Sequence, residues 1–195
     1  MRTTSTPRTA FGRQGAIQGG LIVALGVGAL LVRTRLVGLP PSGRALALGA
    51  IAGSILLASL LVPVPHDRVT PHLPPWLGLA IGLVAVGLAI VVSGSPVPVP
   101  FVAWAVPLSI LAAIAEEALF RRVAYGWLET CGIPVAVIGS ALLFALIHIP
   151  LYGVVVFPVD LGAGLLLSWQ RWATGTWTAP AATHAAANAL LTVMR

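Results

Sequence analysis

The sequence has very little of three residue classes: it contains no lysine, one cysteine and only five acidic residues among 195 positions. A single cysteine, Cys131, excludes an internal disulfide and any cluster of cysteine metal ligands. All eleven basic residues are arginine, and they are scattered near the ends of apolar segments. Nucleic acid is therefore not an expected partner, and arginines at the level of the lipid headgroups explain the net charge of +6.

Charge of either sign is scarce: charged residues make up 8% of the chain, and hydrophobic residues make up 58%. A soluble globular domain carries about 25% charged residues, because water must solvate its surface. A chain with so few charges is typical of a protein that a lipid bilayer surrounds.

Seven apolar stretches are long enough to cross the hydrocarbon core of a bilayer, which takes about 20 helical residues. They cover residues 16–32, 45–63, 76–93, 101–127, 133–150, 153–170 and 176–194. Proline, glycine and charge gather between them, as turn chemistry requires. The sequence therefore predicts an all-α, polytopic transmembrane bundle of about seven helices, located in the cell (plasma) membrane.

Ionisable and strongly polar groups inside these stretches are few, and a charged one costs about 3 kcal/mol on insertion scales unless it has a partner or a function. They are Glu116, Glu117, Arg121, Arg122, His148, Asp160, His184 and Asn188. Asp160 lies in "FPVDLGAG", where proline and glycine indicate a disturbed helix start, so we expect it to be partly hydrated. Most of the other groups are candidates for one functional site.

Helix geometry separates the two adjacent glutamates. Glu117 and Arg121 are four residues apart and share a helix face, so we expect a charge-assisted pair. Glu116 is turned about 100° away from Glu117 and can face a different neighbour. One carboxylate is therefore expected to be structural, and the other is expected to be free of a cation and available for chemistry.

Two histidines and an amide are the groups that Glu116 can face. His184 and Asn188 are four residues apart and flanked by alanines, which allow another helix to approach closely. His148 has Phe144 one turn earlier on the same face. A carboxylate and a neutral imidazole can take a proton from water, and a second histidine with an amide can donate hydrogen bonds to an oxyanion. This set indicates hydrolysis of an amide.

The same residues form three motifs, each in a separate apolar stretch. "EEALFR" begins at Glu116, "FALIH" ends at His148 and "HAAAN" begins at His184. The lead-in "TGTWTAPAATHAAANAL" adds to the pattern. In these motifs and their order, roughly residues 100–192 resemble the CPBP family, the CAAX proteases and bacteriocin-processing proteins, which are also called type II CAAX prenyl endopeptidase-like or Abi proteins.

This resemblance implies an intramembrane endopeptidase, a hydrolase that acts on peptide bonds. It implies that Glu116 and His148 activate water, and that His184 and Asn188 stabilise the oxyanion. The expected partner is a membrane-associated peptide or protein substrate. Exclusive use of arginine, with abundant alanine, glycine and proline, is typical of a GC-rich bacterial gene, for which a prenylated substrate is not the obvious one.

The resemblance also assigns Glu117 and Arg121 to support of the site, in agreement with the pair expected from their spacing. Arg122 departs from the family pattern, since members commonly have a glycine there, and the sequence does not explain its charge. The chain divides into a cytoplasmic N-terminal tail (1–14), N-terminal transmembrane helices (15–98) and the catalytic transmembrane region (99–195).

Three alternatives use the same residues. Glu116, His148 and His184 could hold a zinc ion, but no His-Glu-x-x-His motif is present, so no cofactor is favoured. A proton or ion pathway would also use intramembrane glutamate and histidine, although the sequence shows no internal repeat. A non-catalytic bacteriocin-immunity or scaffold protein is the third alternative, because a fold does not guarantee an activity.

Overall fold

The computed structural model describes residues 13–64, 71–93, 102 and 104–194. In these residues all regular secondary structure is helical, which confirms the all-α prediction. The long elements are α1 (Arg13–Val32), α2 (Pro41–Leu61), α3 (Pro75–Ser93), α4 (Ala105–Glu117), α6 (Ile133–Tyr152), α7 (Phe157–Thr174) and α8 (Thr178–Val193). Their number and places agree with the seven predicted stretches to within a few residues at most ends.

Shorter helical segments connect or extend the long helices. They are the 3-10 helix η1 (Arg33–Gly38), the π-helix η2 (Ala118–Ala124), the short helix α5 (Tyr125–Leu128) and the 3-10 turns η3 (Glu129–Cys131) and η4 (Val154–Val156). The predicted stretch 101–127 becomes one rod made of α4, η2 and α5, and its positions 101 and 103 lie outside the described residues. Most of the predicted tail lies outside them too, since α1 begins at Arg13.

Proline and glycine set several of the helix boundaries. Proline occupies the first turn of α2, α6 and α7, where its missing N–H removes no helical hydrogen bond. Gly175 ends α7 in the left-handed region, with φ 67°, a conformation that glycine adopts without a steric penalty. The chain then re-enters the bundle as α8.

Within the described residues, four helices are long and apolar enough to cross a membrane, at Ile17–Leu36, Pro41–Leu61, Pro75–Val92 and Ile133–Tyr152. Large apolar side chains on them point outward: Leu46 is 77% exposed and Val92 is 86% exposed. Exposure of this extent suits contact with lipid tails, which are as apolar as leucine. The bundle therefore presents the surface of a membrane-embedded protein.

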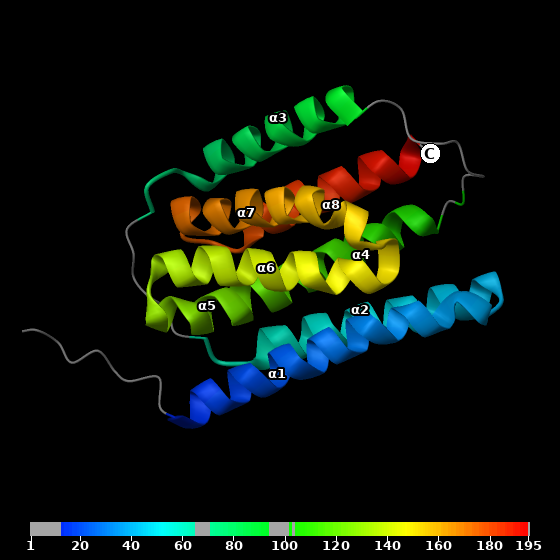
Figure 1. Ribbon diagram of the computed structural model, residues 1–195, viewed down its shortest axis with the longest axis horizontal. Helices are drawn as coiled ribbons and strands as arrows, with labels where there is room; N and C mark the ends of the chain where they lie inside the picture. The colour runs from blue at the N-terminus through cyan, green and yellow to red at the C-terminus, as the bar shows by residue number, and fades with distance from the viewer. Residues whose placement is uncertain (1–12, 65–70, 94–101, 103, 195) are drawn as a thin grey trace, which may run out of the picture.

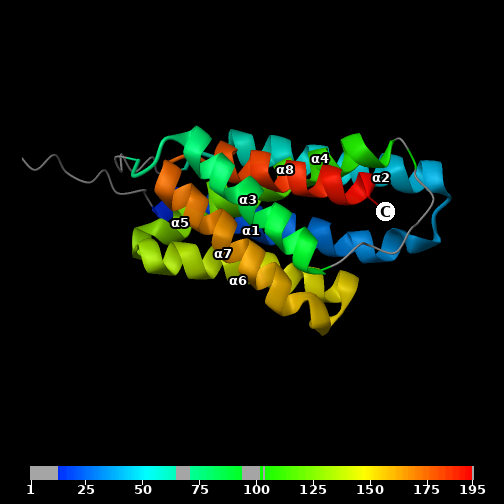
Figure 2. The ribbon, with the colours of Figure 1, turned by 90° about the horizontal axis from the view of Figure 1, so that it is seen from above.

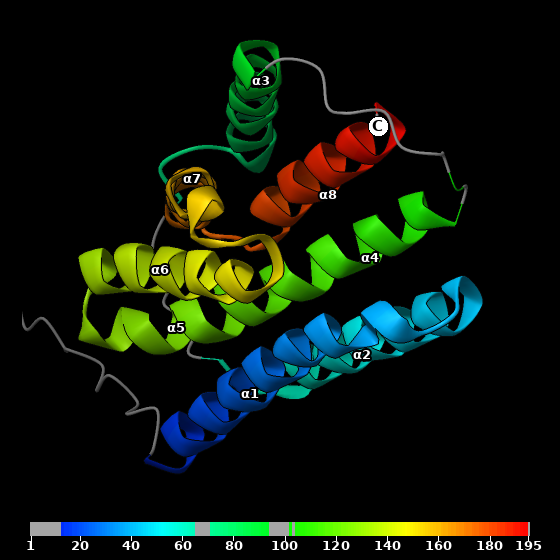
Figure 3. The same cartoon turned by 45° about the vertical axis from the view of Figure 1, so that its right-hand side comes forward.

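The helices pack as a bundle with the α4–α5 rod in its interior. Figures 1 and 3 show α1 and α2 together on one side, α3 on the far side, and α4, α6, α7 and α8 between them, and the helix contacts agree. Seen from above in Figure 2, α7 and α6 run alongside each other, as α4 and α8 do. Leu119, Phe120 and Val123 of the π-helical segment form the centre of the apolar core. The two glutamates stand directly before this core.

Candidate active site

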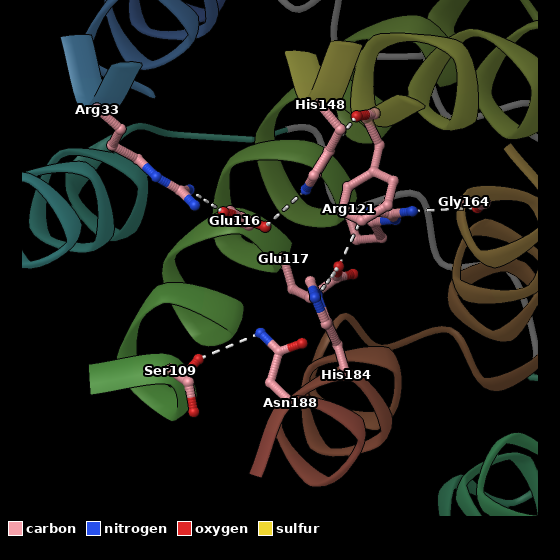
Figure 4. Close-up of polar contacts among 10 residues, drawn as sticks. Arg33, Ser109, Glu116, Glu117, Arg121, His148, Gly164, His184 and Asn188 are labelled. Atoms are coloured by element: carbon pink, nitrogen blue, oxygen red, sulfur yellow. Dashed lines mark hydrogen bonds and ion pairs between the residues drawn. The ribbon is translucent and has the colours of Figure 1, made fainter. Parts of the chain in front are cut away.

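The three motifs meet inside the bundle, although they lie on three different helices. Glu116 and Glu117 are the last residues of α4, His148 lies on α6, and His184 and Asn188 lie on α8. Figure 4 shows the two carboxylates pointing in different directions, with Glu116 toward Arg33 and His148 and Glu117 toward Arg121 and His184. The separation that helix geometry predicted for the two carboxylates is present.

Glu116 faces His148 and also a cation. Its Oε2 lies 4.0 Å from His148 Nε2, and its Oε1 accepts a hydrogen bond of 2.6 Å from Nη1 of Arg33 (Figure 4). The expectation that Glu116 is free of a cation is therefore wrong. Arg33 begins η1, 83 residues earlier in the chain, and packing brings its guanidinium to the carboxylate.

A hydrogen bond to the backbone defines which tautomer the neutral ring of His148 adopts. Its Nδ1 lies 2.7 Å from the backbone carbonyl oxygen of Phe144, one turn earlier in α6. A carbonyl oxygen only accepts, so Nδ1 carries the proton and Nε2 of the neutral ring carries a lone pair. That lone pair belongs to the nitrogen nearer Glu116, which makes Nε2 a proton acceptor in the site.

Glu117 lies on the buried side of α4 and has two donors. Arg121 Nη1 donates to Glu117 Oε1 at 3.0 Å, which confirms the pair expected from the four-residue spacing. His184 Nδ1 lies 2.9 Å from the same oxygen. His184 is therefore held by Glu117, and the carboxylate that holds it is fully buried.

Arg121 is the largest fully buried side chain among the described residues, and three elements surround it. Besides Glu117, it donates from Nη2 to the carbonyl oxygen of Gly164 on α7 at 3.1 Å. Its guanidinium carbon also lies 4.6 Å from the centre of the Phe144 ring, a cation–π distance. The aromatic residue that the sequence placed beside His148 thus also covers the buried ion pair.

The close approach of α7 to α6 depends on glycine at position 164. A Cβ built on Gly164 would lie 2.9 Å from the carbonyl oxygen of Ala141 on α6 and 3.1 Å from its Cα. Backbone atoms cannot move aside as a flexible side chain can. Gly164 therefore lets α7 bring its own carbonyl within reach of Arg121.

The helix carrying the glutamates widens into a π-helix directly after them. In η2 the backbone N–H of Tyr125 bonds to the carbonyl of Phe120, five residues earlier. Arg171 of α7 donates from Nε to the carbonyl of Arg121 at 3.2 Å, so a side chain of another helix contacts this turn. Single π turns of this kind are frequent at functional sites. The α-helix predicted for this stretch is present up to Glu117, and a π-helix replaces it from Ala118.

Arg122, which the sequence left unexplained, binds the end of a neighbouring helix. Its Nη1 donates to the carbonyl oxygens of Ser59 and Val62, where α2 ends. The last carbonyls of a helix have no intrahelical partner, so a cation there is favourable. Arg122 thus serves the packing of α2 against the rod, and it does not line the catalytic cavity described next.

A cavity of about 510 Å³ lies next to the three motifs. Its walls include Glu116, His148, His184 and Asn188, which are the four residues predicted to be catalytic. Glu117 and Arg121 are not part of its lining, in keeping with a supporting position beneath it. We call this space the catalytic cavity.

Two charged residues of the catalytic cavity were missed by sequence reasoning. The sequence predicts that Arg33, like the other arginines, lies at the level of the lipid headgroups, and no spacing signal connects it to Glu116. Asp160, in the first turn of α7, was expected to be partly hydrated. It is half-buried and lines the cavity, and its Oδ2 is buried without a hydrogen-bond partner among the described residues. The regular helix starts before it, at Phe157, so the expected break lies upstream of Asp160.

Asn188, the last of the predicted catalytic residues, forms a hydrogen bond to the backbone of α4. Asn188 Nδ2 donates to the backbone carbonyl of Ser109 on α4 at 3.3 Å (Figure 4). An amide nitrogen has two N–H groups, so the second one remains to be used at the cavity.

Within the part of the chain that the structure describes, no three His, Cys, Asp or Glu side chains form a group that could hold a metal ion.

Comparison with known proteins adds to this geometry. Residues 98–190 match the family model described as "Type II CAAX prenyl endopeptidase Rce1-like". No curated protein and no solved structure matches the chain. The apolar helices and the family match together show that this is a membrane protein. This match covers all three motifs and is consistent with the resemblance to CPBP proteases that the sequence indicates.

Proposed function

We propose that this protein is an intramembrane endopeptidase that hydrolyses a peptide bond in a membrane-associated peptide or protein, with a water activated by Glu116 and His148. One observation carries the proposal: the 4.0 Å between Glu116 Oε2 and His148 Nε2. This gap is too long for a direct hydrogen bond and suits a water that bridges both atoms at about 2.8 Å from each.

Such a water would be held in one orientation. Both flanking atoms are acceptors, because Nε2 of neutral His148 carries a lone pair and Glu116 is a carboxylate. The water donates one hydrogen to each, so its own lone pair points away from them into the catalytic cavity. Transfer of one of these protons as the water attacks a peptide carbonyl is general base catalysis.

Two side chains on α8 are the proposed oxyanion donors. Asn188 has a second amide N–H beyond the one bonded to Ser109, and both Asn188 and His184 line the cavity. His184 uses Nδ1 toward Glu117, so it donates to an oxyanion from Nε2 only when the ring is an imidazolium. Donors aimed at developing charge in a water-poor site contribute strongly to catalysis.

The proposal extends to the setting of the reaction. We place the chain in the cell (plasma) membrane, as a multi-pass protein with a cytoplasmic N-terminal tail. The substrate meets the site from the bilayer, because the helices around the cavity expose apolar side chains to lipid. The mechanism uses no metal ion, since Glu116 and His148 can remove the proton themselves.

The test compares the membrane proteomes of cells that carry the wild-type chain or Glu116→Gln. Uncleaved precursors of one or more membrane proteins are expected to accumulate with the variant and with His148→Ala. Glu129→Gln is the matched control, because Glu129 lies outside the catalytic cavity and the substitution has the same chemistry. If no precursor accumulates with either site variant, the non-catalytic scaffold alternative replaces this proposal.

A further inference from the structure

Arg33 makes a short ion pair with the proposed catalytic base. Its Nη1 lies 2.6 Å from Glu116 Oε1, and the side chains are 17% and 4% exposed. Among the described residues this is the one hydrogen bond of its guanidinium. A guanidinium has five N–H donors, so most of its capacity is unused by the described part of the chain.

Arg33 also stands between two cavities. It lines the catalytic cavity, and it lines a second one of about 300 Å³ between α1, α2 and α4. Ser109, Ala112 and Thr192 are likewise shared by both linings. The rest of the second cavity is formed mainly by apolar side chains such as Leu30, Ile51 and Leu108, which leaves Arg33 as its charged group. We call it the apolar cavity.

We propose that Arg33 is the substrate-recognition residue of this site: it binds a carboxylate of the substrate and, by leaving Glu116 to do so, releases Glu116 to act on the water. This inference rests on the proposed hydrolysis and narrows its substrate class. The substrate is a peptide with a carboxylate near the scissile bond and with apolar groups beside that carboxylate. The carboxylate belongs to the free C-terminus or to an acidic side chain.

The exchange follows from the electrostatics of a largely buried pair. A carboxylate that accepts a charge-assisted bond from a guanidinium is a weaker base than one that faces only a neutral imidazole. Breaking such a pair without replacement leaves two uncompensated charges away from water, which is strongly unfavourable. A substrate carboxylate removes this penalty for Arg33, and the guanidinium fork matches carboxylate geometry. Binding of the correct substrate and release of the base are therefore one event.

The two cavities define how the ligand lies. A chain that passes Arg33 has its reacting bond in the catalytic cavity, next to Glu116 and His148, and places apolar groups in the apolar cavity. A neutral or amidated peptide of the same shape fills the same space but leaves the Arg33 and Glu116 pair closed. This arrangement therefore predicts that the protein binds a peptide with a carboxylate more tightly than the corresponding amide.

The experiment measures binding, which does not depend on turnover. The full chain in detergent is titrated calorimetrically with three probes: an acetylated trileucine with a free C-terminus, its C-terminal amide, and an amidated analogue with one glutamate in the last position. Wild-type protein is expected to bind at least one acidic probe about tenfold more tightly than the neutral amide, as one charge-assisted bond allows. The two acidic probes distinguish the C-terminus from an acidic side chain as the source of the carboxylate.

Glu116→Gln gives the decisive comparison. It removes the internal competitor for Arg33, so the acidic probe is expected to bind about tenfold more tightly than to wild type, while the amide probe is unaffected. A purely structural ion pair predicts no gain for either probe. Arg33→Gln is expected to abolish the preference for the acid, and Arg33→Lys to keep part of it as a point charge.

Two variants guard against loss of folding or of net charge. Arg33→Gln combined with Glu116→Gln leaves no unpaired charge at this position, and it is expected to fold and to bind acid and amide equally. Arg35→Gln removes a positive charge two residues away, at an exposed position outside both cavities, and is expected to behave as wild type.

Two results overturn the inference: equal binding of acid and amide by wild type, or no gain in acid binding from Glu116→Gln. Either result leaves hydrolysis by Glu116 and His148 in place. Conversely, if cells with the Glu116 variant accumulate no precursors, the proposed function is wrong. The binding measurement then still tests the role of Arg33. The two failures are therefore distinguishable.

Discussion

Glu116 and Glu117 are neighbours on one helix, yet they occupy two regions with opposite character. The cavity side of α4 holds Glu116 with Arg33 and His148, at the wall of a space of about 510 Å³. The buried side holds Glu117 with Arg121 and His184, and both Glu117 and Arg121 are fully inaccessible. Each region has one carboxylate, one arginine and one histidine.

The difference between the regions lies in how much room the groups have. On the buried side every distance is that of a direct hydrogen bond, between 2.9 and 3.1 Å for Glu117 and Arg121. On the cavity side the carboxylate and the histidine are 4.0 Å apart. The same residue types therefore act as a rigid support where they are packed and as a reactive pair where a water fits between them.

The largest expected effect separates the regions by chemistry. Glu116→Gln is expected to lower hydrolysis of an identified precursor by about 10²- to 10⁴-fold, the usual contribution of a general base. The loss of unfolding free energy in detergent is expected to be smaller than that of Glu117→Gln, because the unpaired Arg33 keeps 17% exposure whereas Arg121 has none. Unchanged hydrolysis would remove the distinction between the two carboxylates.

The second effect separates them by stability. Glu117→Gln is expected to cost about 3–5 kcal/mol, because it leaves Arg121 charged and unpaired in the core. The double variant Glu117→Leu with Arg121→Met removes both charges and is expected to regain most of this loss. Thermal unfolding of the two variants measures the difference, and equal loss in both would show that the ion pair is not the cause.

A third and smaller effect concerns Arg122, the charge that lies next to the buried pair in sequence. Arg122→Gln is expected to cost about 2 kcal/mol in unfolding free energy, since it removes charge-assisted bonds to the carbonyls that end α2. Hydrolysis per folded molecule is expected to stay the same. A loss of activity without a loss of stability would place Arg122 in the site after all.

The smallest effect tests the helix contact that supports Arg121. Gly164→Ala is expected to cost about 1 kcal/mol, because its Cβ would press on the backbone of Ala141 and shift the carbonyl that Arg121 uses. Gly162→Ala on the same helix is the matched control, since nothing lies within 4 Å of its Cβ. Equal stability of the two variants in thermal unfolding would mean that α7 can move away at no cost.

Much of this molecule could be predicted from local patterns. Seven long helices are predicted from apolar length, and four of them, among the described residues, are long and apolar enough to cross a bilayer, which takes about 20 helical residues. The pair between Glu117 and Arg121 follows from a four-residue spacing, which is a property of one helix. Placement of His148, His184 and Asn188 at one cavity agrees with the three motifs, and their catalytic roles stay predictions until the variants are measured.

Other features could not be predicted, because they join residues that no local rule connects. The Arg33 contact spans 83 residues, and the contacts of Arg122 with the end of α2 span 63 and 60 residues. The π-helical turn after Glu117 is invisible to a period of 3.6 residues. Asp160 became a cavity residue only when α7 packed against α6.

The sequence by itself determined which groups are available: few charges, apolar helices of membrane length, and two carboxylates that one helix must point in different directions. The tertiary structure decided which partner each carboxylate receives. Helix periodicity fixes directions along one helix, whereas the identity of a neighbour depends on how several helices pack, and so on contacts such as that of α7 with α6 at Gly164. For this reason the direction of Glu116 was predictable, and its bond to Arg33 was not.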